Sequence, residues 1–509
     1  MAPDPTQNPN KLPPLMQNWV SLVGAVLSTC TLFGAVALLG VDFIRGMSNP
    51  YEGILTYVIA PGFLMLGLTI VLIGVLLERR RRRLAKPGDV PPFPRIDFNI
   101  SRHRNTFIVG SGGVFMLLVL SAIGSYRAYE FTESVMFCGD TCHQVMSPEK
   151  TAYMESPHAR VTCVQCHIGP GAEWFVKSKI SGLYQVYSVL TNKYSRPIPV
   201  PVENLRPAQE TCEQCHWPRK FFGAVLREGH HYLADETNSP WTIQMALKVG
   251  GGDPSFGPAG GIHWHMNIEN KIEYVAKDPQ RQVIPWVRIT DPNGKVRVYE
   301  ASSGKLTKEE LDKEAPRVMD CIDCHNRPAH RYNPPVDAVN MALFTGRIST
   351  KIPFIKQQAV TVLSKEYVTT DEAKAAIADG LAAYYKAEQT EFAKTNRGLV
   401  EAAIAEVQRI YGQNFFPEMK VNWKPYPDNI GHMNFPGCFR CHDGEHKSDD
   451  GSVITKDCKA CHVIIGQGPQ PTEANQSLEG LEFQHPSDIG DLWMDQNCSE
   501  CHDGTTGGL

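Results

Sequence analysis

Residues 138–167 read CGDTCHQVMSPEKTAYMESPHARVTCVQCH, and this stretch holds two cysteine pairs whose second cysteine is followed directly by histidine. A Cys-x-x-Cys-His spacing is typical of covalent haem attachment, because the two thiols bond the porphyrin and the adjacent histidine ligates the iron. Six regular motifs occur at residues 163–167, 212–216, 321–325, 438–442, 458–462 and 498–502, and a seventh, at 138–143, has one extra residue. The sequence therefore predicts seven covalently bound haem c groups.

The motifs name the residues that would hold these groups. The expected attachment cysteines are Cys138, Cys142, Cys163, Cys166, Cys212, Cys215, Cys321, Cys324, Cys438, Cys441, Cys458, Cys461, Cys498 and Cys501. The expected proximal iron ligands are His143, His167, His216, His325, His442, His462 and His502. Zinc binding and disulfide bonding are the alternatives, since paired cysteines serve both. Zinc does not require a histidine after every second cysteine, so haem is the preferred interpretation. For the irregular Cys138 motif, a disulfide or free thiols remain as alternatives to haem.

Other side chains can supply the second axial ligand of each iron. Nine histidines follow residue 128 outside the motifs. Five of them are close to a motif in sequence and are expected to be distal ligands: His158, His330, His432, His446 and His485. Two clusters are expected to supply one further ligand: His230 with His231, and His263 with His265. Met146, three residues after His143, is a thioether ligand candidate for the first iron, although methionine also fills packing gaps.

Three apolar stretches precede the motifs, at residues 19–41, 54–77 and 107–126, and each is long enough to cross a bilayer as a helix. Residues 79–104 carry nine Lys or Arg and two Asp. Short basic loops stay in the cytoplasm, which predicts a cytoplasmic N-terminus and a periplasmic chain after about residue 128. A cleaved signal is the alternative for the first stretch, but this stretch is too long and has no charged leader. The expected location is the bacterial inner membrane.

The expected fold class is a membrane-anchored multihaem cytochrome c. It has three transmembrane helices, a mainly α or irregular haem-packed periplasmic domain and a small β insertion. The expected parts are an anchor at 1–128 with a cytoplasmic loop at 78–105, a tetrahaem domain at 129–335 with an insertion at 220–315, a haem-free helical segment at 336–430, and a trihaem domain at 431–509.

Local patterns support this division. Within the insertion, VIPWVRI and KVRVYE alternate around Asp291–Gly294, which predicts a hairpin, and either docking or shielding of a haem edge could be its role. Thr369 and Glu372 form a capping-box pattern at the start of a helix. Residues 431–509 are too few to build a large core of their own, so the haems are expected to form its centre.

The stretch from about residue 107 to 330 resembles the NapC/NirT family of membrane-anchored tetrahaem quinol dehydrogenases, which includes the NrfH-type cytochromes. The matching parts are a membrane helix followed by CGDTCHQVM, then YMESPHARVTCVQCHIGPG, CEQCH and CIDCHNRPAH. The resemblance implies menaquinol oxidation at the first haem, distal ligands at His158 and His330, and a quinol pocket lined by Lys177 or Lys179. In NrfH-type members a methionine after the first motif ligates that haem, as Met146 would here.

The chain departs from this family in several respects. It has three expected membrane helices where the family has one, and seven motifs where the family has four. In both respects it resembles in outline the inner-membrane heptahaem cytochromes of metal-respiring bacteria. Some family members carry an acidic residue at the quinol pocket, roughly where this chain reads Gly-Leu-Tyr-Gln at 182–185. The methionine stands three residues after the first motif's histidine, not two.

The leading functional hypothesis is a quinol dehydrogenase that passes electrons from menaquinol through seven haems to a periplasmic acceptor. The alternatives are a terminal reductase of a small oxyanion with an open iron position, and a non-catalytic wiring subunit of a larger respiratory complex. The expected partners are membrane quinol, the lipid bilayer, and periplasmic multihaem cytochromes or a reductase, with an oligomer or complex possible. The net charge of −4 argues against a nucleic-acid partner.

Overall fold

The computed structural model describes residues 14–16, 18–45, 60–84, 97–141, 143–169, 172–202, 205–251, 260–266, 270–470 and 475–505. It divides into two compact units, each of which is described by itself. The first unit comprises Met1–Glu133 and Ile168–Tyr184, and the second comprises Ser134–His167 and Gln185–Leu509.

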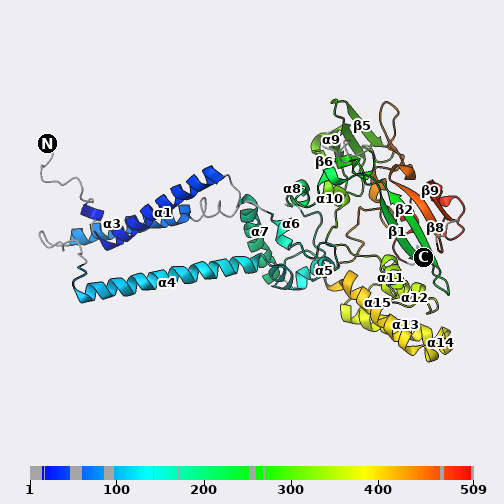
Figure 1. Cartoon of the computed structure of the whole chain (residues 1–509), viewed down its shortest axis with the longest axis horizontal. Coiled ribbons are helices and arrows are strands. Elements are labelled where there is room, and N and C mark those ends of the chain that lie inside the picture. Colours follow the sequence, from blue (N-terminus) through cyan, green and yellow to red (C-terminus); the bar gives the residue numbers. More distant parts are fainter. Residues whose placement is uncertain are drawn as a thin grey trace. The chain divides into compact units, whose positions relative to one another are not determined.

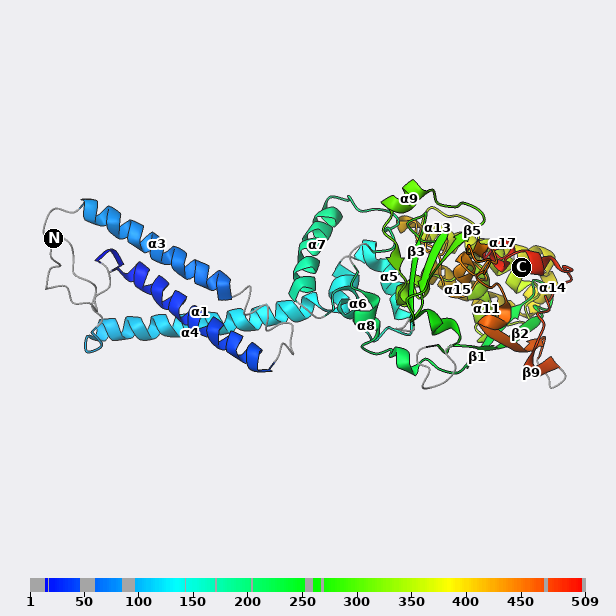
Figure 2. The ribbon, with the colours of Figure 1, turned by 90° about the horizontal axis from the view of Figure 1, so that it is seen from above.

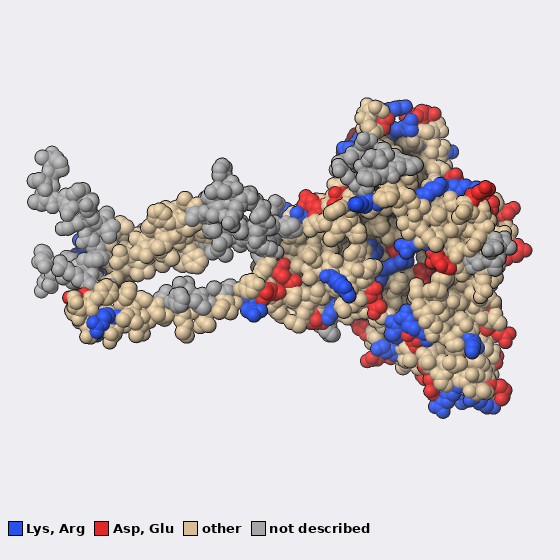
Figure 3. All heavy atoms as spheres, viewed as in Figure 1, with Lys and Arg blue, Asp and Glu red and all other residues tan. Residues whose placement is uncertain are grey.

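Long apolar helices make up most of the first unit. Its elements are η1 (Pro14–Met16), α1 (Trp19–Arg45), α3 (Ala60–Leu84), α4 (Ser101–Thr132) and the first part of α7 (Ala172–Leu190). Within the described residues, two of these helices are long and apolar enough to cross a membrane, over Trp19–Val36 and Ala60–Leu84. Large apolar side chains such as Phe33 and Met65 are exposed on them. Figure 3 shows few charged side chains along these helices, as a lipid-facing surface requires.

Small residues hold α1 against α3, and the two helices run side by side in both views (Figures 1 and 2). A side chain added at Gly67 would place its Cβ 2.4 Å from Ser28 Oγ, so only glycine permits this approach. The Asn18 amide donates to Gly74 O at 3.2 Å, and Ser21 Oγ donates to Val71 O at 3.4 Å. Small residues and interhelical hydrogen bonds are the usual means by which membrane helices associate.

The helix boundaries differ from the expected spans. α3 continues past residue 77 to Leu84, so the run Arg79–Arg83 lies on the helix end and not in a loop, while residues 54–59 lie outside the described part. α4 extends beyond 107–126 at both ends and ends at Thr132, past the expected boundary at 128. Polarity limits a membrane span, whereas a helix can continue into polar residues, as α3 does through Arg79–Arg83.

The helices of the second unit are mostly short. They are the π-helix η3 (Phe137–Thr141), α5 (His143–Met154), α6 (Cys163–His167), α8 (Ala208–Cys212), η4 (Pro218–Lys220), η6 (Ile262–Met266), α9 (Lys308–Lys313), α10 (Cys321–Cys324), α11 (Pro335–Phe344), α12 (Ile355–Leu363), α13 (Thr370–Glu388), α14 (Thr390–Thr395), α15 (Arg397–Asn414), η7 (Pro417–Met419), η8 (Gly437–Arg440), η9 (Cys458–Ala460), α16 (Leu492–Asp495) and α17 (Cys498–Cys501). The longest of them, α13 and α15, lie in the segment that was expected to be helical.

Two antiparallel sheets complete the second unit. One has the order β1 (Val225–Tyr232), β2 (Pro240–Leu247), β8 (His462–Gly468), β9 (Gln476–Leu481). The other has the order β6 (Arg317–Val318), β3 (Lys271–Val275), β4 (Trp286–Thr290), β5 (Val296–Ala301), β7 (His446–Lys447). The pairing of Thr290 with Val296 confirms the hairpin around Asp291–Gly294.

The β structure is larger than the small insertion that we expected, because each sheet combines strands of the insertion with strands of the C-terminal segment. β2 pairs with β8, and β5 pairs with β7. Residues 129–335 and 431–509 therefore do not fold as separate domains. Alternation within a strand predicts a strand but not its partner, since the partner is distant in sequence.

Candidate haem-binding sites

The regular motifs form short helical turns that bring each histidine next to its cysteines. The backbone N–H of His216, His325 and His502 donates to the carbonyl of the motif's first cysteine at 2.8 Å, and that of His442 does so at 3.0 Å. At motif four the Asp320 side chain caps this turn by accepting from Ile322 N at 3.0 Å. The turn places two sulfur atoms and one imidazole at fixed positions, as covalent haem attachment requires.

Six of the motif histidines face a second histidine ring across a gap of nearly constant width. The pairs, with their distances between ring centres, are His167–His330 (6.2 Å), His216–His158 (6.1 Å), His325–His263 (6.3 Å), His442–His265 (5.8 Å), His462–His432 (6.3 Å) and His502–His485 (6.0 Å). Rings that touched each other would not leave this space. An iron bound between two imidazole nitrogens at about 2 Å each puts the ring centres about 6 Å apart.

The hydrogen bonds of the partner histidines also fit iron ligation. Nδ1 of His158, His330 and His263 contacts the backbone carbonyl oxygens of Pro328, Glu149 and Val249 at 3.0, 3.0 and 2.7 Å. Nδ1 of His265 contacts the carbonyl of Ile262 in the same way, whereas Nδ1 of His485 lies near both the carbonyl oxygen and the backbone N–H of Ser487. A bond to a carbonyl oxygen fixes the proton on Nδ1 and leaves Nε2 for a metal. Burial lowers the pKa of His330 to about 4, so its ring is neutral near pH 7, as a ligand must be.

The sixth partner, His432, is held differently. Its ring stacks on Phe439 with 4.4 Å between the ring centres. Phe439 belongs to motif five, whereas the histidine that faces His432 belongs to motif six. The stacking therefore orients the ring without a hydrogen bond at Nδ1 being needed.

Three of the expected distal histidines have other surroundings. His446 is fully buried, and both of its ring nitrogens are engaged, Nδ1 with Asp443 Oδ1 at 2.9 Å and Nε2 with Ile284 O at 2.7 Å. This contradicts the expectation that His446 ligates an iron. His230 stacks on Phe344 at 3.5 Å. Burial, aided by the Lys356 ammonium group, lowers the pKa of His231 to about 4. The two clusters thus provide two partners, His263 and His265, where we expected one.

Cysteines of successive motifs lie within electrostatic reach of one another in the order of the sequence. The neighbours are Cys138 with Cys163, Cys166 with Cys215, Cys212 with Cys321, Cys324 with Cys438, Cys438 with Cys461, and Cys458 with Cys498. Motif one is therefore next to motif two, and so on to motif seven. Groups attached at these cysteines would form one continuous series.

Motif one is described only in part. Cys142 lies outside the described residues, and the same holds for the side chain of His143. Met146 is half-buried and packs against the main hydrophobic core, so its role as a ligand stays a prediction. Next to this motif, a surface hollow of about 300 Å³ is lined by Asp140, Lys150 and Glu155 among others, and Asp140 forms an ion pair with Lys150.

The two lysines expected at a quinol pocket lie on α7 and have different contacts. Lys179 Nζ lies 3.0 Å from Glu133 Oε1 and 3.4 Å from Thr132 Oγ1, at the end of α4. Lys177 Nζ lies 4.8 Å from the ring centre of Trp174. Glu133 thus places a carboxylate beside Lys179, whereas residues 182–185 contain none. It was missed because it belongs to another helix, and only its position directly after a membrane span could have drawn attention to it.

Comparison with known proteins decides the family. Residues 100–199 match the N-terminal region of the NapC/NirT cytochrome c family. The cytochrome c-type protein ImcH of Geobacter sulfurreducens is 46% identical over 487 residues, which cover 95% of this chain and 95% of that protein. The chain belongs to the NapC/NirT cytochrome c family. No solved structure matches it.

Membership of the NapC/NirT family identifies the groups that the motifs hold as covalently bound haem c. It also makes the protein a membrane-anchored cytochrome of electron transfer, in agreement with the apolar helices α1 and α3. The matched region, residues 100–199, contains α4, motif one, motif two and both lysines of α7. Motifs three to seven lie outside the matched region, so what is known of their arrangement rests on the structure of this chain.

Proposed function

We propose that this protein oxidises menaquinol at its first motif and passes the electrons along seven covalently bound haem c groups to a periplasmic acceptor. The observation that carries the proposal is the set of six histidine pairs whose ring centres are 5.8–6.3 Å apart. Each bound haem would supply an iron that takes up and releases one electron. The chain's own contribution is to fix the two imidazoles of each pair and to hold the motifs in sequence order.

The proposed ligand set follows from the pairs. The proximal ligands are the seven motif histidines, and the distal ligands are His330, His158, His263, His265, His432 and His485 for motifs two to seven. His446, His230 and His231 are left out. Met146 is proposed for motif one. Two histidines at each haem would leave its iron no open position for a substrate, which would favour electron transfer over substrate chemistry.

The proposed topology has three membrane spans and a periplasmic second unit. α4 is 32 residues long, or about 48 Å, which exceeds the thickness of the hydrocarbon core. The cations Arg81, Arg82 and Arg83 stand in the last turn of α3, where they would mark the cytoplasmic side. Cys138 follows the end of α4 by six residues, which can span at most about 20 Å. Motif one would therefore lie close to the membrane surface.

The quinol site is proposed at Lys179 and Glu133. A quinol loses two protons and two electrons when it is oxidised: a carboxylate close to an ammonium group can accept one proton, and the other can leave to water on the exposed side of the pair. The Glu133 side chain is 13% exposed and its partner Lys179 is 40% exposed, so the pair is accessible from one side. Lys179 can donate a hydrogen bond to a quinol oxygen while Glu133 receives the proton. Lys177 is the weaker candidate because its ammonium group already lies over Trp174.

The test is quinol-dependent haem reduction by the purified, fully loaded protein in detergent, followed by absorbance with a menaquinol analogue. We expect reduction by the wild type, and a rate at least tenfold lower in Lys179→Ala and Glu133→Gln. Dithionite should still reduce all haems, and the intact mass should still show seven haem additions. Lys193→Ala is the matched control, since Lys193 bonds the Tyr187 hydroxyl at 3.0 Å and not Glu133.

Two outcomes would contradict the proposal at different levels. If the wild type is not reduced by quinol, the protein is a wiring subunit that needs a partner for oxidation. If the wild type is reduced but both variants keep its rate within twofold, the quinol binds elsewhere, and the hollow lined by Asp140 and Lys150 becomes the next site to test.

A further inference from the structure

The insertion contacts motif four and motif five at the same time. Motif four is the last of the tetrahaem part that resembles the NapC/NirT family, and motif five begins the C-terminal trihaem part. Between them the chain runs through the haem-free helical segment, residues 336–430, so the sequence alone does not bring them together. The contacts come from three places: an aspartate inside motif four, an arginine inside motif five, and the turn η6.

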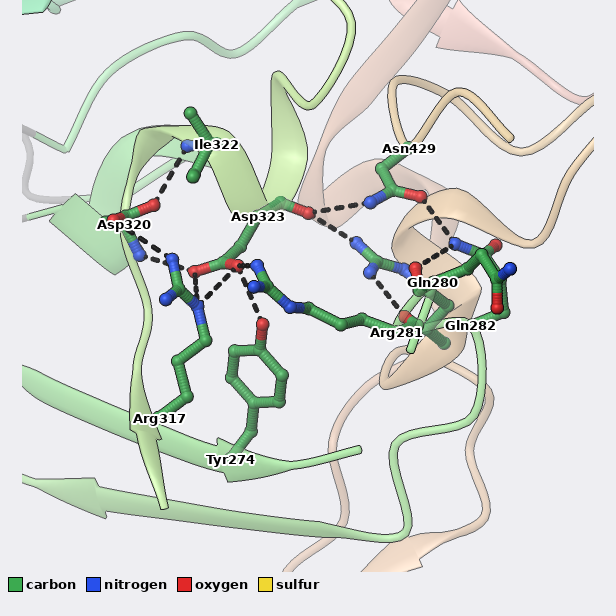
Figure 4. Close-up of polar contacts among 10 residues, drawn as sticks. Tyr274, Gln280, Arg281, Gln282, Arg317, Asp320, Ile322, Asp323 and Asn429 are labelled. Atoms are coloured by element: carbon green, nitrogen blue, oxygen red, sulfur yellow. Dashed lines mark hydrogen bonds and ion pairs between the residues drawn. The ribbon is translucent and has the colours of Figure 1, made fainter. Parts of the chain in front are cut away.

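Asp323, between the two cysteines of motif four, is the centre of a buried polar cluster (Figure 4). Its side chain is 2% exposed. The carboxylate accepts hydrogen bonds from the Tyr274 hydroxyl at 2.7 Å, from Arg281 Nη1 at 2.7 Å and from Arg317 Nε at 2.9 Å. Tyr274 and Arg281 belong to the insertion, and Arg317 lies on β6 directly after it. The insertion therefore binds motif four through Asp323, the most buried side chain of that motif.

Arg440, between the two cysteines of motif five, joins that motif to the same cluster. Its Nη2 donates to the main-chain oxygen of Asp323 and its Nη1 to that of Arg281, both at 2.8 Å. Its Nε donates to Gly437 O at 2.8 Å within its own turn. All three nitrogens of the guanidinium thus bond carbonyl oxygens, one in motif four, one in the insertion and one in Gly437, directly before motif five. This planar fork fixes direction as well as distance, which a lysine would not do.

Three further contacts tie motif five, and the strand that follows it, to the insertion. His265 on η6 faces His442 of motif five, while His263, two residues earlier on the same turn, faces His325 of motif four. β5 of the insertion pairs with β7, four residues after motif five, through Ala301 with His446. The Nε2 of His446 contacts Ile284 O of the insertion at 2.7 Å. His446 is therefore a structural contact between the two parts.

We propose that the insertion is a clasp that fixes motif four against motif five, with His265 as the distal ligand of the fifth haem and Arg440 as its main positioning residue. The clasp keeps one separation and one orientation at the joint between the tetrahaem and trihaem parts. The proposal rests on the proposed function, because it assumes haem at both motifs. It assigns the insertion a role other than docking a partner or covering a haem edge.

Electron paramagnetic resonance of the oxidised, fully loaded full-length protein tests both parts of the proposal. In His265→Ala we expect one iron to change from low spin to high spin with no loss of haem mass. In Arg440→Gln we expect a change in the magnetic interaction between neighbouring low-spin irons, and partial recovery in Arg440→Lys. Arg397→Gln is the matched control, because Arg397 is exposed and pairs with Glu401 on α15.

The opposite results overturn the proposal. If the His265→Ala protein shows no high-spin iron, His265 is not the distal ligand of the fifth haem. If the Arg440→Gln protein carries seven haems and has the wild-type spectrum, the insertion does not fix motif four against motif five. If Arg440→Gln fails to load the fifth haem, Arg440→Lys is measured instead, and an unchanged spectrum in that variant has the same meaning. Neither measurement uses quinol. A loaded protein that does not oxidise quinol would therefore refute the proposed function and leave the clasp to be judged separately.

Discussion

The haem-free helical segment, residues 336–430, and the C-terminal segment, residues 431–505, are neighbours in the chain but differ in what fills their interiors. Among the described residues, 24 buried apolar side chains lie in the helical segment, and they make up most of the main core. The C-terminal segment contributes one, Ile464. It contains three motifs, while the helical segment contains none.

This difference indicates two sources of stability within one unit. The helical segment is stabilised by close packing of side chains, which in a core contributes about 25 cal/mol for each Å² of apolar surface removed from water. The C-terminal segment has too few such side chains to fold in this way. Its interior must be supplied by the attached groups, by the shared strands β8 and β7, and by the clasp around Asp323. Each of the following predictions perturbs one of these two sources of stability and not the other.

The largest effect is expected from loss of the last haem. In Cys498→Ala/Cys501→Ala, cleavage of residues 475–505 by a protease specific for glutamate should accelerate by about a thousandfold, or about 4 kcal/mol of local stability. Cleavage after Glu391 or Glu401 in the helical segment should be unchanged. Mass spectrometry of timed digests gives both rates.

Cys30→Ala is the control for removing a thiol, because Cys30 lies in α1, far in sequence from every motif. Equal protection of residues 475–505 with and without the seventh haem would show that this haem does not stabilise the C-terminal segment.

Packing in the helical segment gives the second prediction. Leu381 on α13 is 1% exposed, and its truncation in Leu381→Ala should lower the free energy of unfolding by about 3 kcal/mol through lost burial and a new cavity. Leu478→Ala in the C-terminal segment removes the same atoms from a side chain that is 94% exposed, and it should change stability by less than about 0.5 kcal/mol. Denaturant titration followed by far-ultraviolet circular dichroism measures both. A similar loss in the two variants would mean that the comparison is wrong.

A buried lysine makes the helical segment sensitive to pH. Burial lowers the pKa of Lys356 from 10.5 to about 8, although the Asp337 carboxylate raises it, and its ammonium group donates to Tyr232 O. Between these two pKa values the unfolded chain binds one more proton than the folded chain, so stability rises with pH. We expect a rise of about 2 kcal/mol between pH 8 and 9.5, below the range in which buried tyrosines ionise.

The control variant for this effect is Lys356→Met, which keeps an unbranched side chain one atom shorter than lysine and removes the charge. Its free energy of unfolding should not show the rise. The wild type and the variant are compared at each pH, so that other titrating groups cancel. A wild type whose stability stays flat over this interval would show that Lys356 keeps its proton in the folded chain up to pH 9.5, as a lysine in water does.

The sequence predicted local features well, because they depend on residues that are close in the chain. The motif turns, the hairpin at Asp291–Gly294 and the long helices α1 and α4 all belong to this class. Partners that are distant in the chain were beyond its reach. His446 was chosen because it follows His442 by four residues, yet it bonds Ile284. His167 faces His330, and Lys179 meets Glu133, only because the fold joins separate segments.

The start of α13 lies between these cases. The sequence predicted a capping box from Thr369 to Glu372, and half of it is confirmed. Thr369 Oγ1 accepts from Glu372 N at 3.2 Å, but the Glu372 carboxylate accepts from Val368 N at 3.0 Å and not from the N–H of Thr369. The pattern predicted which residue caps the helix, while the partner of Glu372 depends on the backbone conformation of the residues just before the helix.

This cap gives the smallest expected effect. Thr369→Ala removes the acceptor for one backbone N–H at the end of a helix, and it should lower the free energy of unfolding by about 1 kcal/mol. Thr369→Ser keeps the hydroxyl oxygen and should stay within about 0.5 kcal/mol of the wild type. Since the cap belongs to the segment stabilised by packing, the alanine variant should leave proteolysis of residues 475–505 and the haem mass unchanged. If Thr369→Ala also exposes those residues to the protease, the two segments unfold together, and their stabilities are not separate.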